Sequence, residues 1–219
     1  MKNAMNLKSI VMLSATVTSL TLGLSFTLIP RAHAYYSTLD TGDTLGEKKY
    51  DVSLEPQVIL NRYDGFNLVG RVDAGINEES NLRAIMGFGK VDFQAGALYK
   101  YIPFPDTSHQ PAIGFTTGAI YAHVQGSSEL NLRFTPLVSK KAKVEDVNLN
   151  LFASVPFGVL VRDNTTTIPI QIAAGTEWKI PSNEQFSIMG ELGVNVSNAF
   201  SYISFAGVYY FDESMIHGK

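Results

Sequence analysis

The chain has 219 residues, a length typical of one domain, with 17 basic and 20 acidic side chains and a formal net charge of −3. It contains no cysteine, which excludes both a disulfide framework and a lipid-modified N-terminal cysteine. Because the balance is acidic and no basic patch stands out, we expect no nucleic-acid partner.

The first 34 residues have the pattern of a secretory leader. Lys2 and Lys8 precede a long apolar run, and Ala32 and Ala34 follow it as an A-x-A site. We predict cleavage after Ala34, so that residues 1–34 are a signal peptide and the mature chain is exported. The apolar run is also long enough for a transmembrane anchor, but the small-residue site favours a leader.

The mature chain divides into an extension, a strand-rich region and a tail. Residues 35–49 are polar and contain glycine, and residues 212–219 follow the last strand-like segment. Between them, residues 50–211 contain ten segments of strand character separated by turn-forming sequences. The ten segments are residues 50–61, 65–76, 81–88, 91–101, 112–124, 128–138, 148–161, 167–180, 185–196 and 201–211.

Nearly every segment alternates an apolar face with a face of charges, amides or glycine. In the ninth segment, Phe186, Ile188 and Leu192 alternate with Ser187 and Glu191. A soluble barrel or sandwich turns such an apolar face inward, whereas a membrane barrel turns it toward lipid. Alternation alone is therefore consistent with both.

The positions of the aromatic residues favour the membrane barrel. If successive segments run in opposite directions, the rings of the apolar face gather at two heights, as they do at the two membrane interfaces. Phe66, Phe88 and Tyr121 lie at the upper height. The lower aromatic girdle is predicted to contain Tyr50, Tyr99, Tyr101, Trp178, Phe186, Tyr209 and Phe211.

The polar face carries charges of both signs. Glu55 and Arg71 face each other across the first predicted hairpin, and Arg133 and Glu191 have the same inward phase. Together with glycines on this face, these charges suit a narrow lumen in which opposite charges pair. We predict that the four residues form a lumen charge network.

The leader, the ten alternating segments and the aromatic rims together resemble a small Gram-negative outer-membrane β-barrel protein of the broad OmpA-like, eight- to ten-stranded class. The final segment, SYISFAGVYYF, ends on Phe211, and in that class a terminal aromatic residue is recognised by the insertion machinery. The chain departs from the class in two ways. Residues follow Phe211, and the longest predicted connections, 103–111 and 139–146, lie on the side of the termini.

The resemblance implies a fold, a location and two partners. The fold is all-β: an up-and-down antiparallel transmembrane β-barrel, most simply of ten strands. Its location is the cell outer membrane. Its expected partners are outer-membrane lipid and, during biogenesis, the outer-membrane barrel insertion machinery.

Two sequence features raise the question of catalysis. The stretch LDTGDT contains the Asp-Thr-Gly of aspartic proteases, but those enzymes need two such aspartates and Asp40 has no second copy. We expect a flexible polar tail there. A lipid-modifying hydrolase would need His123, Ser127 or Ser128, and Glu129 on one face. Since His123 has the apolar phase and Glu129 the polar phase, we predict a rim histidine.

The sequence thus predicts a non-enzymatic outer-membrane barrel, with a structural role or a narrow passage for ions and small solutes. It predicts no catalytic residue, no metal site and no cofactor. Two alternatives are a small outer-membrane hydrolase and a soluble periplasmic lipocalin-like carrier whose apolar face points inward. Long inward side chains in a barrel of ten strands predict little or no conductance.

Overall fold

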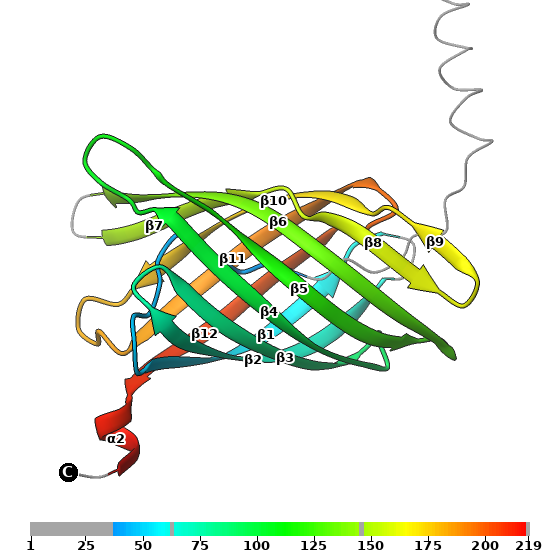
Figure 1. The fold of residues 1–219 in the computed structure, drawn as a ribbon, viewed down its shortest axis with the longest axis horizontal. Helices are drawn as coiled ribbons and strands as arrows, with labels where there is room; N and C mark the ends of the chain where they lie inside the picture. The colour runs from blue at the N-terminus through cyan, green and yellow to red at the C-terminus, as the bar shows by residue number, and fades with distance from the viewer. Residues whose placement is uncertain (1–36, 62–63, 145–146, 218–219) are drawn as a thin grey trace, which may run out of the picture. The chain divides into compact units, whose positions relative to one another are not determined.

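The computed structural model describes residues 37–61, 64–144 and 147–217. The predicted signal peptide and its cleavage site lie outside these residues. The described residues form a closed antiparallel β-barrel that ends in a short helix, α2 (Glu213–His217) (Figure 1). No helix among them is long and apolar enough to cross a membrane.

Twelve strand segments make up ten strands of the barrel. β7 and β8 both pair with β6 and together form the seventh strand, while β9 and β10 form the eighth. The prediction of a ten-stranded, all-β antiparallel barrel is therefore confirmed. The segments are β1 (Lys49–Ile59), β2 (Gly65–Asn77), β3 (Ser80–Gly89), β4 (Phe93–Phe104), β5 (Ala112–Val124), β6 (Ser127–Val144), β7 (Val147–Ser154), β8 (Phe157–Arg162), β9 (Thr165–Thr167), β10 (Ile170–Lys179), β11 (Phe186–Ser197) and β12 (Tyr202–Asp212).

The first and last strands close the barrel. β1 pairs with both β2 and β12, and Tyr50 lies opposite Phe211 in this register. The two rings stack with their centroids 5.6 Å apart. Since β1 begins and β12 ends at the same rim, we call this rim the terminal end and the opposite rim the far end.

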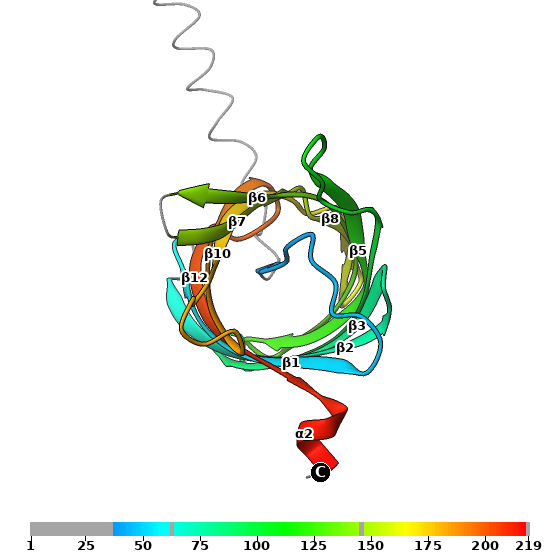
Figure 2. The ribbon, with the colours of Figure 1, turned by 90° about the vertical axis from the view of Figure 1, so that its left-hand side faces the viewer.

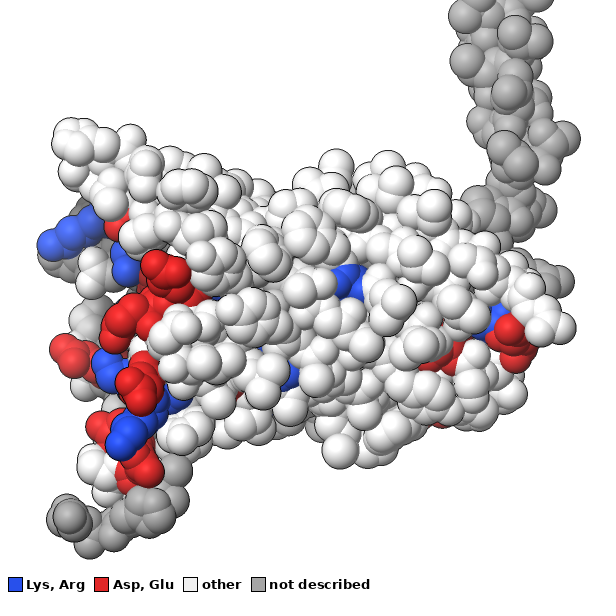
Figure 3. Space-filling model, in the orientation of Figure 1, with Lys and Arg blue, Asp and Glu red and all other residues white. Residues whose placement is uncertain are grey.

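The wall of the barrel is apolar outside and polar inside. Neighbours in β11 illustrate the contrast, because Leu192 is 48% exposed on the outer face whereas Glu191 is 3% exposed on the inner face. Most of the visible wall in Figure 3 is free of charged residues; most of those in view gather at the end where α2 lies, and a few lie at the opposite end. The lipocalin-like alternative required the apolar face to point inward, and the structure has the reverse.

One predicted connection is instead a strand. Residues 139–146 were expected to be a charged loop, but Ser139–Val144 continues β6 and pairs with β7. Lys141 lies opposite Asn150, and Lys143 lies opposite Asn148. The alternation of lysine with alanine and valine is compatible with a strand, and backbone pairing with β7 stabilises it. Along this extension of β6 toward the terminal end, every second side chain continues to face the lumen.

Candidate functional site

A segment of the chain lies inside the barrel. Residues Ser37–Leu45, which we call the lumen segment, precede β1 and run within the ring of strands (Figure 2). Ser37, Leu39 and Asp40 are each no more than 3% exposed. The flexible polar tail expected at Asp40 is therefore wrong, because contacts with the barrel wall hold this part of the extension.

Glu191 binds the backbone at the start of the lumen segment. Its two carboxylate oxygens accept hydrogen bonds from the N–H groups of Thr38 and Leu39, at 2.8 and 2.7 Å. Tyr202 donates a further hydrogen bond from its hydroxyl to Glu191. A Cβ on Gly193 would come within 2.2 Å of the Tyr202 ring, so glycine leaves the space in which this ring lies.

Arginines of the wall bind the carbonyl groups of the same stretch. Arg71 and Arg83 each donate to the Thr38 carbonyl oxygen at 3.0 Å, and Arg133 donates to the Ser37 carbonyl oxygen at 3.4 Å. A chain inside a barrel has no neighbouring strand to satisfy its backbone. Here charged side chains supply the donors and acceptors that a strand would have supplied.

The four residues predicted as a lumen charge network all lie inside the barrel. Glu55 and Arg71 form a buried ion pair across the first hairpin. Glu191 and Arg133 contact the lumen segment, as Arg71 also does, and Arg133 donates to Thr135. The prediction considered only the wall, so it missed the segment that these side chains bind.

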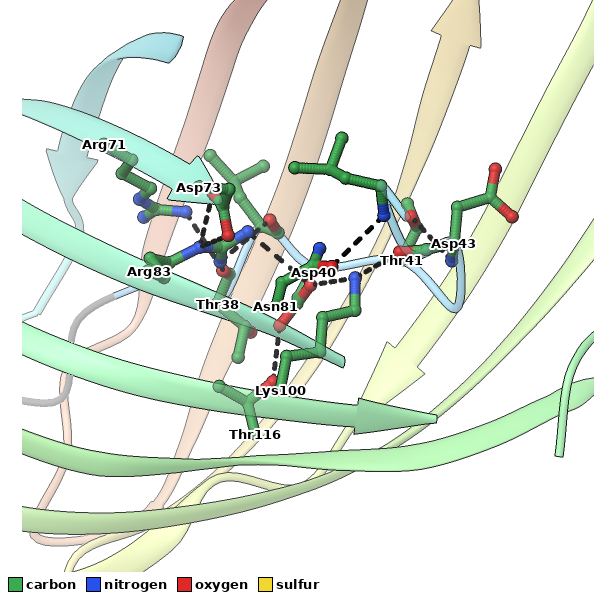
Figure 4. A network of polar contacts seen from close by, with 12 residues as sticks. Thr38, Asp40, Thr41, Asp43, Arg71, Asp73, Asn81, Arg83, Lys100 and Thr116 are labelled. Atoms are coloured by element: carbon green, nitrogen blue, oxygen red, sulfur yellow. Dashed lines mark hydrogen bonds and ion pairs between the residues drawn. The ribbon is translucent and has the colours of Figure 1, made fainter. Parts of the chain in front are cut away.

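Asp40 lies at the centre of a second group of buried charges (Figure 4). The Lys100 Nζ lies 2.8 Å from Asp40 Oδ1, and Thr116 donates its hydroxyl to Asp40 Oδ2. Arg83 lies 3.6 Å from Asp40 and also binds Asp73, with 2.9 Å from its Nε to each carboxylate oxygen. Asp51, a third buried carboxyl, also lies near Arg83 and Lys100, so three carboxyl groups share two cations in this group.

Local backbone geometry fits the lumen segment closely to the wall. A Cβ on Gly42 would come within 2.3 Å of the Ala112 Cβ, so a larger residue there would push the segment away from β5. Leu39 adopts a left-handed φ of 38°, which costs about 1 kcal/mol for a residue with a side chain. Such a conformation persists where the surrounding contacts determine it.

Asp43 holds the outer part of the lumen segment at the terminal end. Lys141 lies 2.8 Å from its Oδ1 and Lys179 lies 2.8 Å from its Oδ2. Burial alone would raise the pKa of the Asp43 carboxyl, but Lys179, and then Lys141, hold that pKa below its usual range. The Asp43 carbonyl oxygen accepts a 2.6 Å hydrogen bond from Lys100, which joins this contact to the Asp40 group.

A cavity of about 220 Å³ lies between the lumen segment and the wall. Met189 and Val208 line its apolar side, and Lys100 and Asp51 line its polar side. Tyr210 also lines it and donates its hydroxyl to Glu177. The cavity can hold water or a small polar solute.

The predicted aromatic girdle lies on the outer face, near the terminal ends of the strands. Besides the pair that closes the barrel, Tyr209 stacks on Phe211 at 6.2 Å and Tyr99 stacks on Tyr101 at 6.5 Å between centroids. Phe186 lies opposite Tyr209 in the β11–β12 register, and Trp178 is the penultimate residue of β10.

The candidate hydrolase residues are not brought together. His123 and Ser128 lie opposite each other in the β5–β6 register, on the outer face, where the hydroxyls of Ser128 and Tyr121 are 2.9 Å apart. Glu129 is buried on the inner face and forms an ion pair with Arg162 at 3.1 Å. Within the part of the chain that the structure describes, no group of three or more potential metal ligands occurs.

Neither a protein-family model nor a curated protein matches the chain. Among solved structures, it is similar to a de novo designed transmembrane β-barrel, with 13% identity and a TM-score of 0.39 over 75% of this chain and 97% of that one. A bacterial polysaccharide outer-membrane secretin gives 12% identity and a TM-score of 0.42, over 74% and 65% of the two chains. The translocator domain of the autotransporter NalP from Neisseria meningitidis gives 9% and 0.42, over 93% and 95%. At these identities and TM-scores, the likeness does not extend to function.

Proposed function

We propose that this chain is an integral β-barrel protein of the outer membrane, exported through a cleaved signal peptide. We further propose that its lumen segment obstructs the lumen, so that large solutes do not pass through it. Its role is then structural and non-enzymatic, and it is not a general porin. The observation that carries the proposal is the polarity of the wall, which is apolar outside and charged inside.

The outer surface suits hydrocarbon better than water. Large apolar side chains such as Leu54, Phe205 and Ile172 are more than half exposed, and they belong to different strands around the barrel. Monomeric soluble proteins rarely expose contiguous apolar surface of this extent. A closed barrel also pairs the backbone groups of its strands internally, which is the condition for crossing a bilayer.

The interior supports a closed barrel. At about eight strands side chains nearly fill a barrel, and ten strands lie close to that limit. Here the lumen segment takes up further space and is held by Glu191, Arg71 and Lys100. A narrow passage for small ions is a second candidate, favoured by the 220 Å³ cavity beside the segment.

Two measurements test this proposal. The mature chain should remain with outer membranes through carbonate or urea extraction and be released by detergent, because only detergent replaces lipid around the apolar wall. Recovery as a soluble periplasmic monomer would contradict the membrane location. In planar bilayers, the pure protein should show small or no conductance. Large, steady and non-selective conductance would contradict the closed lumen and indicate a general porin.

A further inference from the structure

The terminal end of the lumen carries a cluster of lysines on one face. Lys141 and Lys143 project from the hairpin extension of β6, and Lys179 ends the neighbouring β10. Lys179 lies opposite Asn148 of β7, which itself lies opposite Lys143. Two strands, β6 and β10 on either side of β7, therefore place three ammonium groups around one mouth of the barrel.

This cluster already binds one oxyanion, the carboxylate of Asp43. Each of its two oxygens has its own lysine, with Lys141 at 2.8 Å from one and Lys179 at 2.8 Å from the other. Lys143 is exposed and has no ion-pair partner among the described residues. The cluster can therefore engage more negative charge than Asp43 supplies, although Glu177 farther along β10 offsets part of the surplus.

A cavity of about 360 Å³ adjoins the cluster. It is lined by the three lysines together with Asn148 and Asn150, and by the apolar side chains of Ala142 and Leu149. Asn150 is only 3% exposed, and its Oδ1 accepts a hydrogen bond from Ser139. Its Nδ2 has no hydrogen-bond partner among the residues that the structure describes. Leaving a buried amide donor without a hydrogen bond costs free energy. The Asn150 amide can therefore donate to an oxygen of an incoming anion, in addition to the contacts from the lysines.

We propose that this mouth is a binding site for a small oxyanion with two or more negative charges, of the phosphate or phosphate-ester class, and that Asp43 of the chain's own lumen segment competes for it. A phosphate group offers three or more acceptor oxygens, so it can engage Lys143 as well as the two lysines that Asp43 binds. Binding of the anion then releases the outer part of the lumen segment from Lys141 and Lys179.

Titration of the full-length protein in detergent micelles tests this site, with inorganic phosphate as the probe and calorimetry as the readout. Asp43→Asn frees two lysines and should tighten phosphate binding at least tenfold. Lys143→Gln should weaken it by about fivefold, the effect of losing one exposed ion pair. Lys140→Gln is the matched control, because Lys140 lies on the same strand but binds Asp106 at 2.8 Å instead. Its affinity should stay within about twofold of the wild type.

Two results would overturn the site. One is the absence of saturable phosphate binding in both the wild type and Asp43→Asn, with circular dichroism showing a folded barrel. The other is an equal effect of Lys143→Gln and Lys140→Gln. If Asp43→Asn does not fold, the comparison of the two lysine variants decides alone. A second arm with a soluble short-chain phosphatidic acid identifies the source, since tighter binding than phosphate indicates a lipid headgroup and equal or weaker binding indicates a free solute.

Discussion

Lys100 on β4 and Asp40 of the lumen segment form an ion pair inside the barrel, with 2.8 Å between Nζ and Oδ1. The side chains of both residues are no more than 5% exposed. Because neither charge reaches bulk water, each depends on the other for its stability. The barrel wall should therefore be less stable when the lumen segment is displaced, because Lys100 would then lose its counter-charge.

Asp40→Asn should destabilise the barrel by about 3–5 kcal/mol, because it leaves Lys100 buried without its counter-charge. Lys100→Met in the same background should restore much of that loss. Unfolding by urea in lipid vesicles measures the free energies. Additive losses in the double variant would show that the two side chains do not depend on each other.

The buried Glu55–Arg71 ion pair should show the same kind of coupling as the Asp40–Lys100 pair. Loss of either partner should cost up to about 3–5 kcal/mol, and loss of both should cost less than the sum of the two. Arg71 also binds the Thr38 carbonyl, so Arg71→Met should be the more damaging single change. If Glu55→Gln alone were neutral, the pair would contribute nothing to stability.

Neighbouring residues of β11 should report opposite environments. Ile188 lies on the exposed outer face, whereas Met189 is buried on the inner face. A nitroxide spin label at position 188 should relax more strongly with oxygen, which dissolves in lipid, than a label at 189. Equal oxygen accessibility would contradict the proposed facing. Leu192→Arg on the outer face should cost about 2–4 kcal/mol, the range for a cation near the bilayer midplane.

Acid should loosen the outer part of the lumen segment. The pKa of Asp43 is lowered in the folded protein, so its contribution to stability is complete above the unfolded pKa of about 3.9 and is lost as the pH falls through the folded value. A spin label at Leu45 should therefore become mobile only below about pH 4. In Asp43→Asn the label should be mobile at neutral pH already. The same acid transition in Asp43→Asn would show that another group is responsible.

Several properties of this protein follow from local sequence. Alternation of apolar and polar residues sets the strands, and side chains two residues apart share a face wherever the strand lies. For this reason Glu55, Arg71, Arg133 and Glu191 could be assigned to one interior, and the ten strands could be counted. Alternation by itself left open which face meets water, because it is the same in a soluble and a membrane barrel, and only the positions of the aromatic residues favoured the membrane.

Tertiary structure decided what lies within the barrel. Leu39 and Glu191 are 152 residues apart, and no local pattern in LDTGDT indicates that its backbone binds a distant carboxylate. The same holds for Ser139–Val144. Its lysines are typical of a loop, and only its pairing with β7 makes it a strand. Local sequence determines the direction of side chains, whereas the partners of a buried charge or an unpaired backbone group depend on which distant segments the closed barrel brings together.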